Sequence, residues 1–158
     1  MRKAALYGMG AAILDVAANL WHVVSHVGQH VLSLPEWQLA YVILVIFIAP
    51  VAAAVLLWTR YRRGGAWLLL ASMAGSFVFG LAYHFLIAGP DNAFALEPGA
   101  WQTAFRVSAA FLLLAQGTGC LVGVWILSWR ARPSEAATRA RPTGGLGRSH
   151  QSSQAGPR

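Results

Sequence analysis

Three histidines in two apolar segments have the spacing and residue type of a metal site. His22 and His26 lie four residues apart in the first apolar segment, and His84 lies near the end of the third. Residues at positions i and i+4 share one face of a helix, so both imidazoles of the pair can reach one ion. Imidazole binds zinc, copper and iron, and it is also an axial ligand of haem. The residues therefore predict a site for haem or for a transition metal (Cu, Zn or Fe).

The histidine pair continues a polar line along its helix. Asp15, Asn19, His22 and His26 follow one another at spacings of four, three and four residues. At about 100° per residue they fall within an arc of roughly 60°. Ionisable groups inside a membrane usually face a bundle interior or a water-filled cavity, and they mark functional sites. His30 comes four residues later, at the surface end of this line, and is the weakest candidate of the series.

The composition indicates that these segments cross a membrane. Of 158 residues, 57% are hydrophobic and only 11% are charged, where soluble domains average about 25%. Each apolar stretch reaches the roughly 20 residues that span a hydrocarbon core of about 30 Å. We expect an all-α integral membrane protein with a transmembrane domain over 1–129 and helices at about 4–29, 37–58, 66–88 and 101–129.

Turn signals between these stretches predict a simple topology. Short links at Leu34-Pro35-Glu36 and Arg63-Gly64-Gly65, and a longer loop opened by Gly89-Pro90, would join sequential helices as antiparallel neighbours. The result is an up-down-up-down four-helix bundle. Pro50 is expected to kink the second helix, because proline lacks the amide hydrogen of a regular turn.

Basic residues set the expected orientation. They flank the N-terminus, the link between helices two and three and the end of helix four, while the other two links carry only acids. The positive-inside rule then places both termini in the cytoplasm, in what we expect to be a bacterial plasma (inner) membrane. The segment 130–158 is predicted to be a disordered basic tail, since it has too few aliphatic residues to form a core. The basic residues behind the net charge of +7 would set the orientation of the helices and be attracted to anionic lipid head groups. No nucleic-acid partner is therefore expected.

This orientation places the three histidines and Arg106 in the same outer layer. Arg106 is expected either to reach the head groups or an acid of the preceding loop, or to contact an anionic ligand such as a haem propionate. Small residues on helices one and three, including Gly28 and Gly80, would leave room for a flat macrocycle. The same glycines are also explained by close helix packing, which is the favoured interpretation.

A second polar set lies near the predicted mid-plane of the membrane. Asp15, Asn19, Ser76 and Gln116 are expected to meet in the bundle interior. They form a candidate proton path. The alternative is interhelical hydrogen bonding, worth about 0.6 kcal/mol per contact on average.

The sequence leaves three functions open. The favoured one is a small membrane protein that binds a metal ion or haem through His22, His26 and His84, in redox or metal-handling physiology. The alternatives are a proton-coupled transporter or channel that uses the buried Asp/His line, and a non-catalytic accessory subunit of a larger membrane complex or homo-oligomer. No P-loop, dinucleotide fingerprint, H-E-x-x-H motif or serine elbow is present, so no enzyme class is indicated.

Overall fold

The computed structural model describes residues 2–32 and 34–129, and this part of the chain is helical without β-strands. The elements, with η denoting a π-helix, are α1 (Arg2–Gly28), α2 (Glu36–Tyr41), η1 (Val42–Ile48), α3 (Ala49–Leu57), α4 (Arg62–Leu81), η2 (Ala82–Leu86) and α5 (Gln102–Trp129). They form four spans that are long and apolar enough to cross a membrane. The prediction of an all-α chain with four such helices is confirmed. The predicted tail, 130–158, lies outside the described residues.

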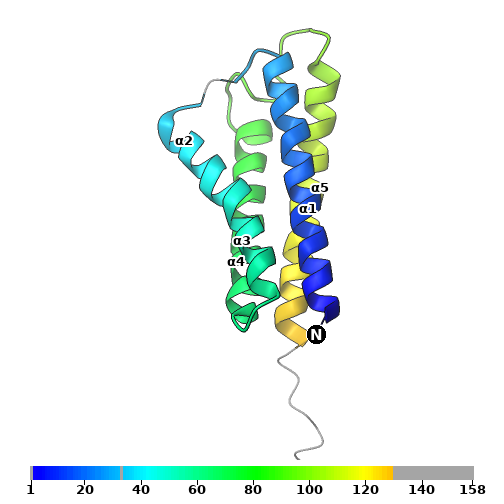
Figure 1. The fold of residues 1–158 in the computed structure, drawn as a ribbon. Helices are drawn as coiled ribbons and strands as arrows, with labels where there is room; N and C mark the ends of the chain where they lie inside the picture. The colour runs from blue at the N-terminus through cyan, green and yellow to red at the C-terminus, as the bar shows by residue number, and fades with distance from the viewer. Residues whose placement is uncertain (1, 33, 130–158) are drawn as a thin grey trace, which may run out of the picture.

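The four spans form a bundle in which helices adjacent in the sequence pack together (Figure 1). Helix α1 packs against α3 and α5, and α4 packs against the same two helices, so α1 and α4 lie on a diagonal. Residues 29–32, 34–35 and 87–101 lie at one end, called the loop end below. The N-terminus and the turn 58–61 lie at the other, the terminal end. At the loop end, α2 leans away from the bundle.

The second span differs from the single kinked helix that the sequence predicts. It consists of α2, then the π-helix η1, then α3, with Pro50 in the first turn of α3. A π-helix replaces i→i+4 bonds with i→i+5 bonds and widens the turn. Because Pro50 has no amide hydrogen to continue the preceding ladder, the irregular geometry lies directly before it. The structure thus has a π-helix before Pro50, which the predicted kink did not include.

The predicted turn at Arg63-Gly64-Gly65 was wrong. These residues lie within the first turn of α4, and the chain reverses at 58–61 instead. Gly65 is buried because the helices approach closely there. A Cβ on Gly65 would lie 2.9 Å from the backbone nitrogen of Leu57 and 3.0 Å from the carbonyl oxygen of Ala53. The glycine permits the α3–α4 contact rather than a turn.

Helix α1 ends in a Schellman motif formed by the residues after the histidine pair. Val31 N–H donates to the His26 carbonyl at 3.1 Å, and His30 N–H donates to the Val27 carbonyl at 3.1 Å. This arrangement needs a left-handed residue, and His30 supplies it with φ of 59°. His30 is exposed. It ends the helix and does not contribute to the histidine cluster.

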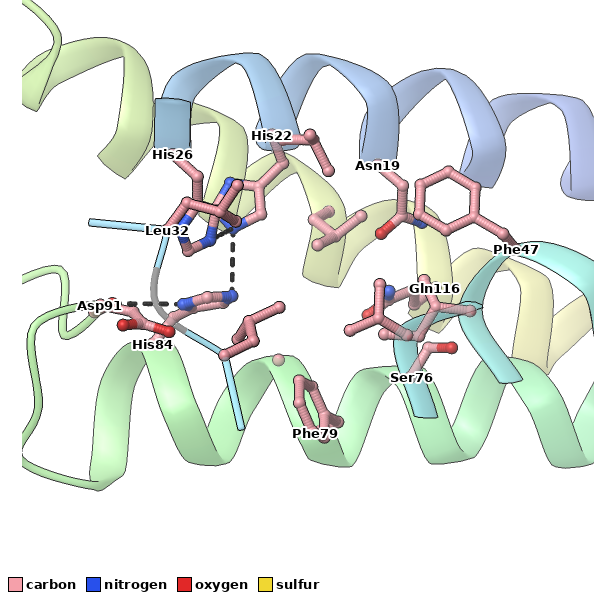
Figure 2. A pocket seen from close by; sticks show the side chains of 16 residues that line it. Asn19, His22, His26, Leu32, Phe47, Ser76, Phe79, His84, Asp91 and Gln116 are labelled. Atoms are coloured by element: carbon pink, nitrogen blue, oxygen red, sulfur yellow. Dashed lines mark hydrogen bonds between the residues drawn. The ribbon is translucent and has the colours of Figure 1, made fainter. Parts of the chain in front are cut away.

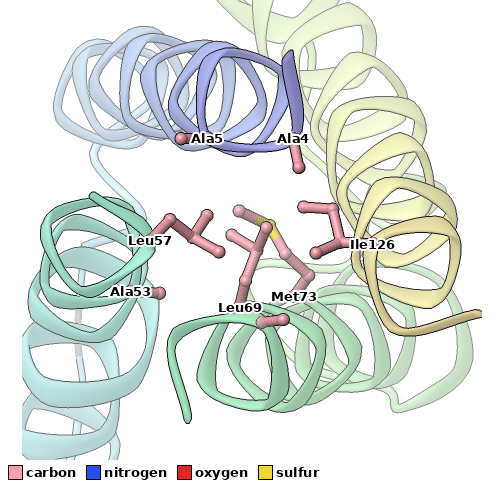
Figure 3. Close-up of a cluster of buried hydrophobic side chains, with 8 residues drawn as sticks. Ala4, Ala5, Ala53, Leu57, Leu69, Met73 and Ile126 are labelled. Atoms are coloured by element: carbon pink, nitrogen blue, oxygen red, sulfur yellow. The ribbon is translucent and has the colours of Figure 1, made fainter. Parts of the chain in front are cut away.

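The interior is divided into an apolar part and a polar part. Near the terminal end, an apolar cluster fills the space between all four spans (Figure 3). Its members are Ala4, Ala5, Ala53, Leu57, Ala66, Leu69, Met73 and Ile126. Toward the loop end, the buried side chains are mainly polar, and Asp15, Asn19, His22 and His26 of α1 all face inward. The predicted inward polar line on the first helix is confirmed.

The outer surface of the spans is apolar. Large side chains such as Ile13, Val78 and Leu121 are exposed on three different helices. In water such surface would be costly, but it suits contact with acyl chains. Trp37 and Trp67 are also exposed near span ends, where an amphipathic indole suits the head-group layer.

Candidate metal centre

The structure brings the three predicted histidines together at the bundle axis. His22 and His26 project from α1, and His84 projects from η2 on the diagonally opposite span (Figure 2). His22 Nε2 lies 3.0 Å from His84 Nε2 and 3.1 Å from His26 Nε2. One ligand atom from each ring lies within 4.8 Å of the others. The contact between the first and third spans, which the three-histidine prediction required, is made by these side chains.

His84 is held by a π-helix and by the loop that follows it. The turn is closed by the Ile87 N–H, which donates to the Ala82 carbonyl at 2.7 Å across an i→i+5 interval. The loop then returns to the histidine. Ala93 N–H donates to the His84 carbonyl at 2.8 Å, and His84 Nδ1 contacts the Asp91 carbonyl oxygen at 3.2 Å. A π-helix inserted in an α-helix frequently occurs at a functional site, and here it carries one of the three imidazoles.

The Asp91 carbonyl determines which nitrogen of His84 carries the proton. A carbonyl oxygen can only accept a hydrogen bond, so neutral His84 must donate through Nδ1–H. Its Nε2 then holds a lone pair that points at His22. Histidine ligands of metal ions usually have this arrangement, with the second nitrogen donating to a carbonyl or carboxylate.

His22 has an equivalent partner on α5. Its Nδ1 lies 2.9 Å from Ser108 Oγ, and the serine hydroxyl donates to the Phe105 carbonyl at 3.0 Å. The serine oxygen also lies 3.3 Å from Ser25 Oγ, so its single proton has several acceptors and the direction of the His22 contact depends on the His22 tautomer. If Ser108 donates to Nδ1, His22 Nε2–H donates to His84 Nε2 at 3.0 Å. If Ser108 accepts from Nδ1–H, two lone-pair nitrogens face each other there. Such a pair repels unless a proton or a cation lies between the two nitrogens.

His26 also brings an imidazole nitrogen to the cluster. Its Nε2 lies 3.1 Å from His22 Nε2, and its buried Nδ1 has no hydrogen-bond partner within the described residues. In the tautomers that carry the proton on Nδ1, the three rings present Nε2 lone pairs to one another. A cation would satisfy this arrangement.

Phe105 encloses the cluster and was not singled out from the sequence. It is fully buried on α5, and its ring centroid lies 5.0, 4.7 and 5.6 Å from those of His22, His26 and His84. Ser108 was missed as well. Both residues lie on one face of α5, and the sequence of this helix contains many other apolar and small residues at comparable positions. Their role becomes visible only when the structure shows that they lie beside His22.

The predicted mid-plane residues are also buried in the interior. Asn19 Nδ2 donates to the Asp15 carboxylate at 3.0 Å and to the Asp15 carbonyl at 2.9 Å. Ser76 and Gln116 face the same interior from α4 and α5. Within the described residues, Ser76 Oγ has no hydrogen-bond partner, and the Gln116 amide approaches the Asp15 carboxyl without a hydrogen bond of good geometry. A role of the four as a proton path stays a prediction.

Arg106 lies beside the site rather than in it. Its Nε donates to the Ala93 carbonyl at 2.7 Å, which attaches α5 to the loop that holds His84. A contact from Arg106 to an anionic ligand stays a prediction. Asp91, in the same loop, is largely buried, and this burial raises the pKa of its carboxyl above the usual 3.8.

Comparison of the chain with protein-family models, with curated proteins and with solved structures found no match. The function is therefore argued from the chemistry of the three-histidine cluster.

Proposed function

We propose that this chain is a membrane protein that binds one first-row transition-metal ion through His22, His26 and His84. The single observation that carries the proposal is the convergence of three buried imidazole rings, with one ligand nitrogen from each within 4.8 Å of the others. Imidazole is a preferred ligand of Zn²⁺, Cu²⁺ and Fe²⁺. The site would leave a fourth coordination position for a further ligand, as three-histidine zinc sites do.

The distances between the nitrogens support a single ion. With Zn–N bonds of about 2.0–2.1 Å, two ligands of a tetrahedral site lie about 3.3 Å apart. His22 Nε2 is 3.0 Å from His84 Nε2 and 3.1 Å from His26 Nε2. The three ligand atoms all lie within 4.8 Å of one another, so the rings would need to draw together, mainly His26 toward His84, to place all three nitrogens around one ion.

The same geometry argues against haem. A haem between His84 and the α1 pair would need to separate imidazole nitrogens that now lie 3.0 Å apart. Gly28, which would leave space for a macrocycle, is instead covered by the Trp101 ring. The neighbour of Gly28 is a loop residue and not a helix, so this contact does not test the interpretation that the glycines serve helix packing.

The membrane setting is part of the proposal. The four spans have the length and composition to cross a bilayer, and the positive-inside rule favours cytoplasmic termini. The histidine cluster would then lie in the outer half of a plasma membrane. A site in that position suits redox or metal-handling physiology.

Equilibrium dialysis of the purified protein in detergent against Zn²⁺ tests the proposal. We expect one ion per chain near neutral pH, measured as metal content. We also expect the affinity to fall as the pH is lowered, because protons compete with the metal for imidazole nitrogen. Cu²⁺ in parallel dialysis would show which metal the site prefers.

The control is the variant in which His22, His26 and His84 are all replaced by alanine. It should retain only loosely bound metal, with no fixed stoichiometry. The proposal is wrong if the wild type binds no more Zn²⁺ or Cu²⁺ than this variant does. Stoichiometric binding that does not respond to pH would also contradict histidine ligation.

A further inference from the structure

A cavity of about 60 Å³ lies directly beside the three histidines. Figure 2 shows the imidazoles at one end and Asn19, Ser76 and Gln116 at the other. One wall is apolar and is built mainly from η1 and α4, including Ile46, Phe47 and Phe79. Polar side chains from three helices, Asn19 of α1, Ser76 of α4 and Gln116 of α5, form what we call the polar wall at the end away from the imidazoles, so the cavity extends the histidine site toward the middle of the bundle.

The polar wall carries buried groups that make no hydrogen bond of good geometry within the described residues. The hydroxyl of Ser76 has no partner, and the Gln116 amide has a contact with the Asp15 carboxyl that falls short of hydrogen-bond geometry; both residues are fully inaccessible to bulk solvent. A buried amide that makes no hydrogen bond loses its hydration without compensation. Native structures satisfy such groups with ordered water where the space is polar and large enough.

The cavity is lined mostly by apolar atoms, but it has the volume and the polar partners that an ordered water needs. One water molecule needs roughly 10–15 Å³ of such volume and two to four polar partners. The cavity offers about 60 Å³. Ser76, Gln116 and Asn19 supply donors and acceptors on its wall, and His26 Nδ1 is a further buried atom without a hydrogen-bond partner within the described residues at the histidine cluster.

Gly80 keeps the space between the histidines and the amide open. A Cβ at this position would lie 3.7 Å from Gln116 Oε1 and 4.0 Å from His84 Cδ2. These are ordinary contact distances, so an alanine would fit there and would fill part of the space. The glycine thus marks where the polar wall and the histidine cluster meet.

The apolar cluster lies beyond the polar wall toward the terminal end. Met73 lies one turn before Ser76 on α4 and packs against Gly119, one turn after Gln116 on α5. A Cβ on Gly119 would come within 2.6 Å of Met73 Sδ, so no space separates the helices at this level. The cavity is therefore closed on the terminal side.

We propose that the cavity is a water-filled chamber, open to the histidine cluster and closed toward the terminal end. Its water molecules bond to Asn19, Ser76 and Gln116. One of them fills the fourth coordination position of the metal, a step that rests on the proposed function. Asp15, bonded to Asn19 at 3.0 Å, stands at the closed end of this hydrated region.

The test measures water inside the metal-free protein, so its outcome is independent of metal binding. Two buried leucines form a matched pair: Leu112 lines the chamber and Leu69 belongs to the apolar cluster. Their exposed fractions are 3% and 0%. In deuterated protein with protonated leucine methyls, nuclear magnetic resonance should show magnetisation transfer from water to Leu112 and none to Leu69.

Each alternative outcome overturns part of the proposal. Transfer to neither leucine would show a dry cavity. Transfer to both would show that water passes the apolar cluster, and the chamber would not be closed. A positive result in a protein that binds no metal would keep the chamber and remove only its link to a coordination position.

Gly80→Ala provides the second variant. The added methyl group fits without a clash, so the fold and the Leu69 methyl signals should stay unchanged. The transfer to Leu112 should weaken because the methyl group occupies part of the chamber. Unchanged transfer would contradict the assignment of Gly80 to the junction between the histidines and Gln116.

Discussion

Replacing His84 with alanine should abolish stoichiometric metal binding while the bundle stays folded. His84 is the only one of the three ligands that does not come from α1, because it projects from η2. Its loss therefore leaves only the His22 and His26 pair. Loss of a hydrogen-bond partner behind a metal ligand already costs roughly 10- to 100-fold in affinity. Loss of the ligand itself should cost more. Calorimetric titration with Zn²⁺ would measure the change.

The matched control is His30→Ala. His30 is exposed and lies outside the cluster, so its replacement should leave the affinity for Zn²⁺ within about twofold of wild type, a free-energy difference below RT. The account fails if His84→Ala and His30→Ala bind zinc equally well. Circular dichroism on both variants would show that a loss of binding is not a loss of fold.

Adding one methyl group at Gly65 should destabilise the bundle. The new Cβ would meet the backbone nitrogen of Leu57 at 2.9 Å and the carbonyl oxygen of Ala53 at 3.0 Å. Backbone atoms cannot move aside as a flexible side chain can, so α3 and α4 must separate. Overpacking of this kind costs typically about 1–3 kcal/mol. The free energy of unfolding in mixed micelles should fall accordingly.

Gly64→Ala is the adjacent control and should change stability in the opposite direction. A Cβ at Gly64 meets nothing within 4 Å. Alanine in a helix is favoured over glycine by roughly 0.5–1 kcal/mol, so this variant should be slightly more stable than wild type. Equal effects at the two positions would contradict the close α3–α4 contact described for Gly65.

The parts of the fold that depend on residue periodicity could be predicted from the sequence. Four apolar stretches gave the four spans, and the spacing of Asp15, Asn19, His22 and His26 correctly predicted one inward face of α1. His84 was grouped with the α1 pair only because all three were predicted to lie at the same depth in the membrane. The grouping was correct because the interior of a four-helix bundle is narrow, so inward-facing residues at one depth lie close together.

The parts that depend on close packing could not be predicted. Glycine is compatible with both turns and close helix contacts, and Gly65 was assigned to a turn because its partners, Leu57 and Ala53, are visible only in three dimensions. The π-helix η2 leaves no pattern in five residues that distinguishes it from an α-helix. It nevertheless determines how the Asp91 carbonyl reaches His84.

The hydrogen-bond partners of the histidines were also beyond sequence reasoning. Ser108 is one of several small polar residues in the spans, and nothing in its neighbourhood in the sequence connects it to His22. The Asp91 carbonyl assigns the His84 proton to Nδ1, and the His22 contact with Ser108 is compatible with either tautomer. The His84 assignment leaves its Nε2 as a lone-pair nitrogen that faces His22.

X-ray absorption spectroscopy of the Zn²⁺-loaded protein tests the central claim most directly. It reports the ligand atoms of the bound ion and their distances. We predict three imidazole nitrogens at about 2.0–2.1 Å and one further light ligand, with the imidazole signal lost in the His22, His26 and His84 triple variant. A zinc ion coordinated by oxygen alone, or with the same imidazole signal in that variant, would contradict a metal centre built by these three residues.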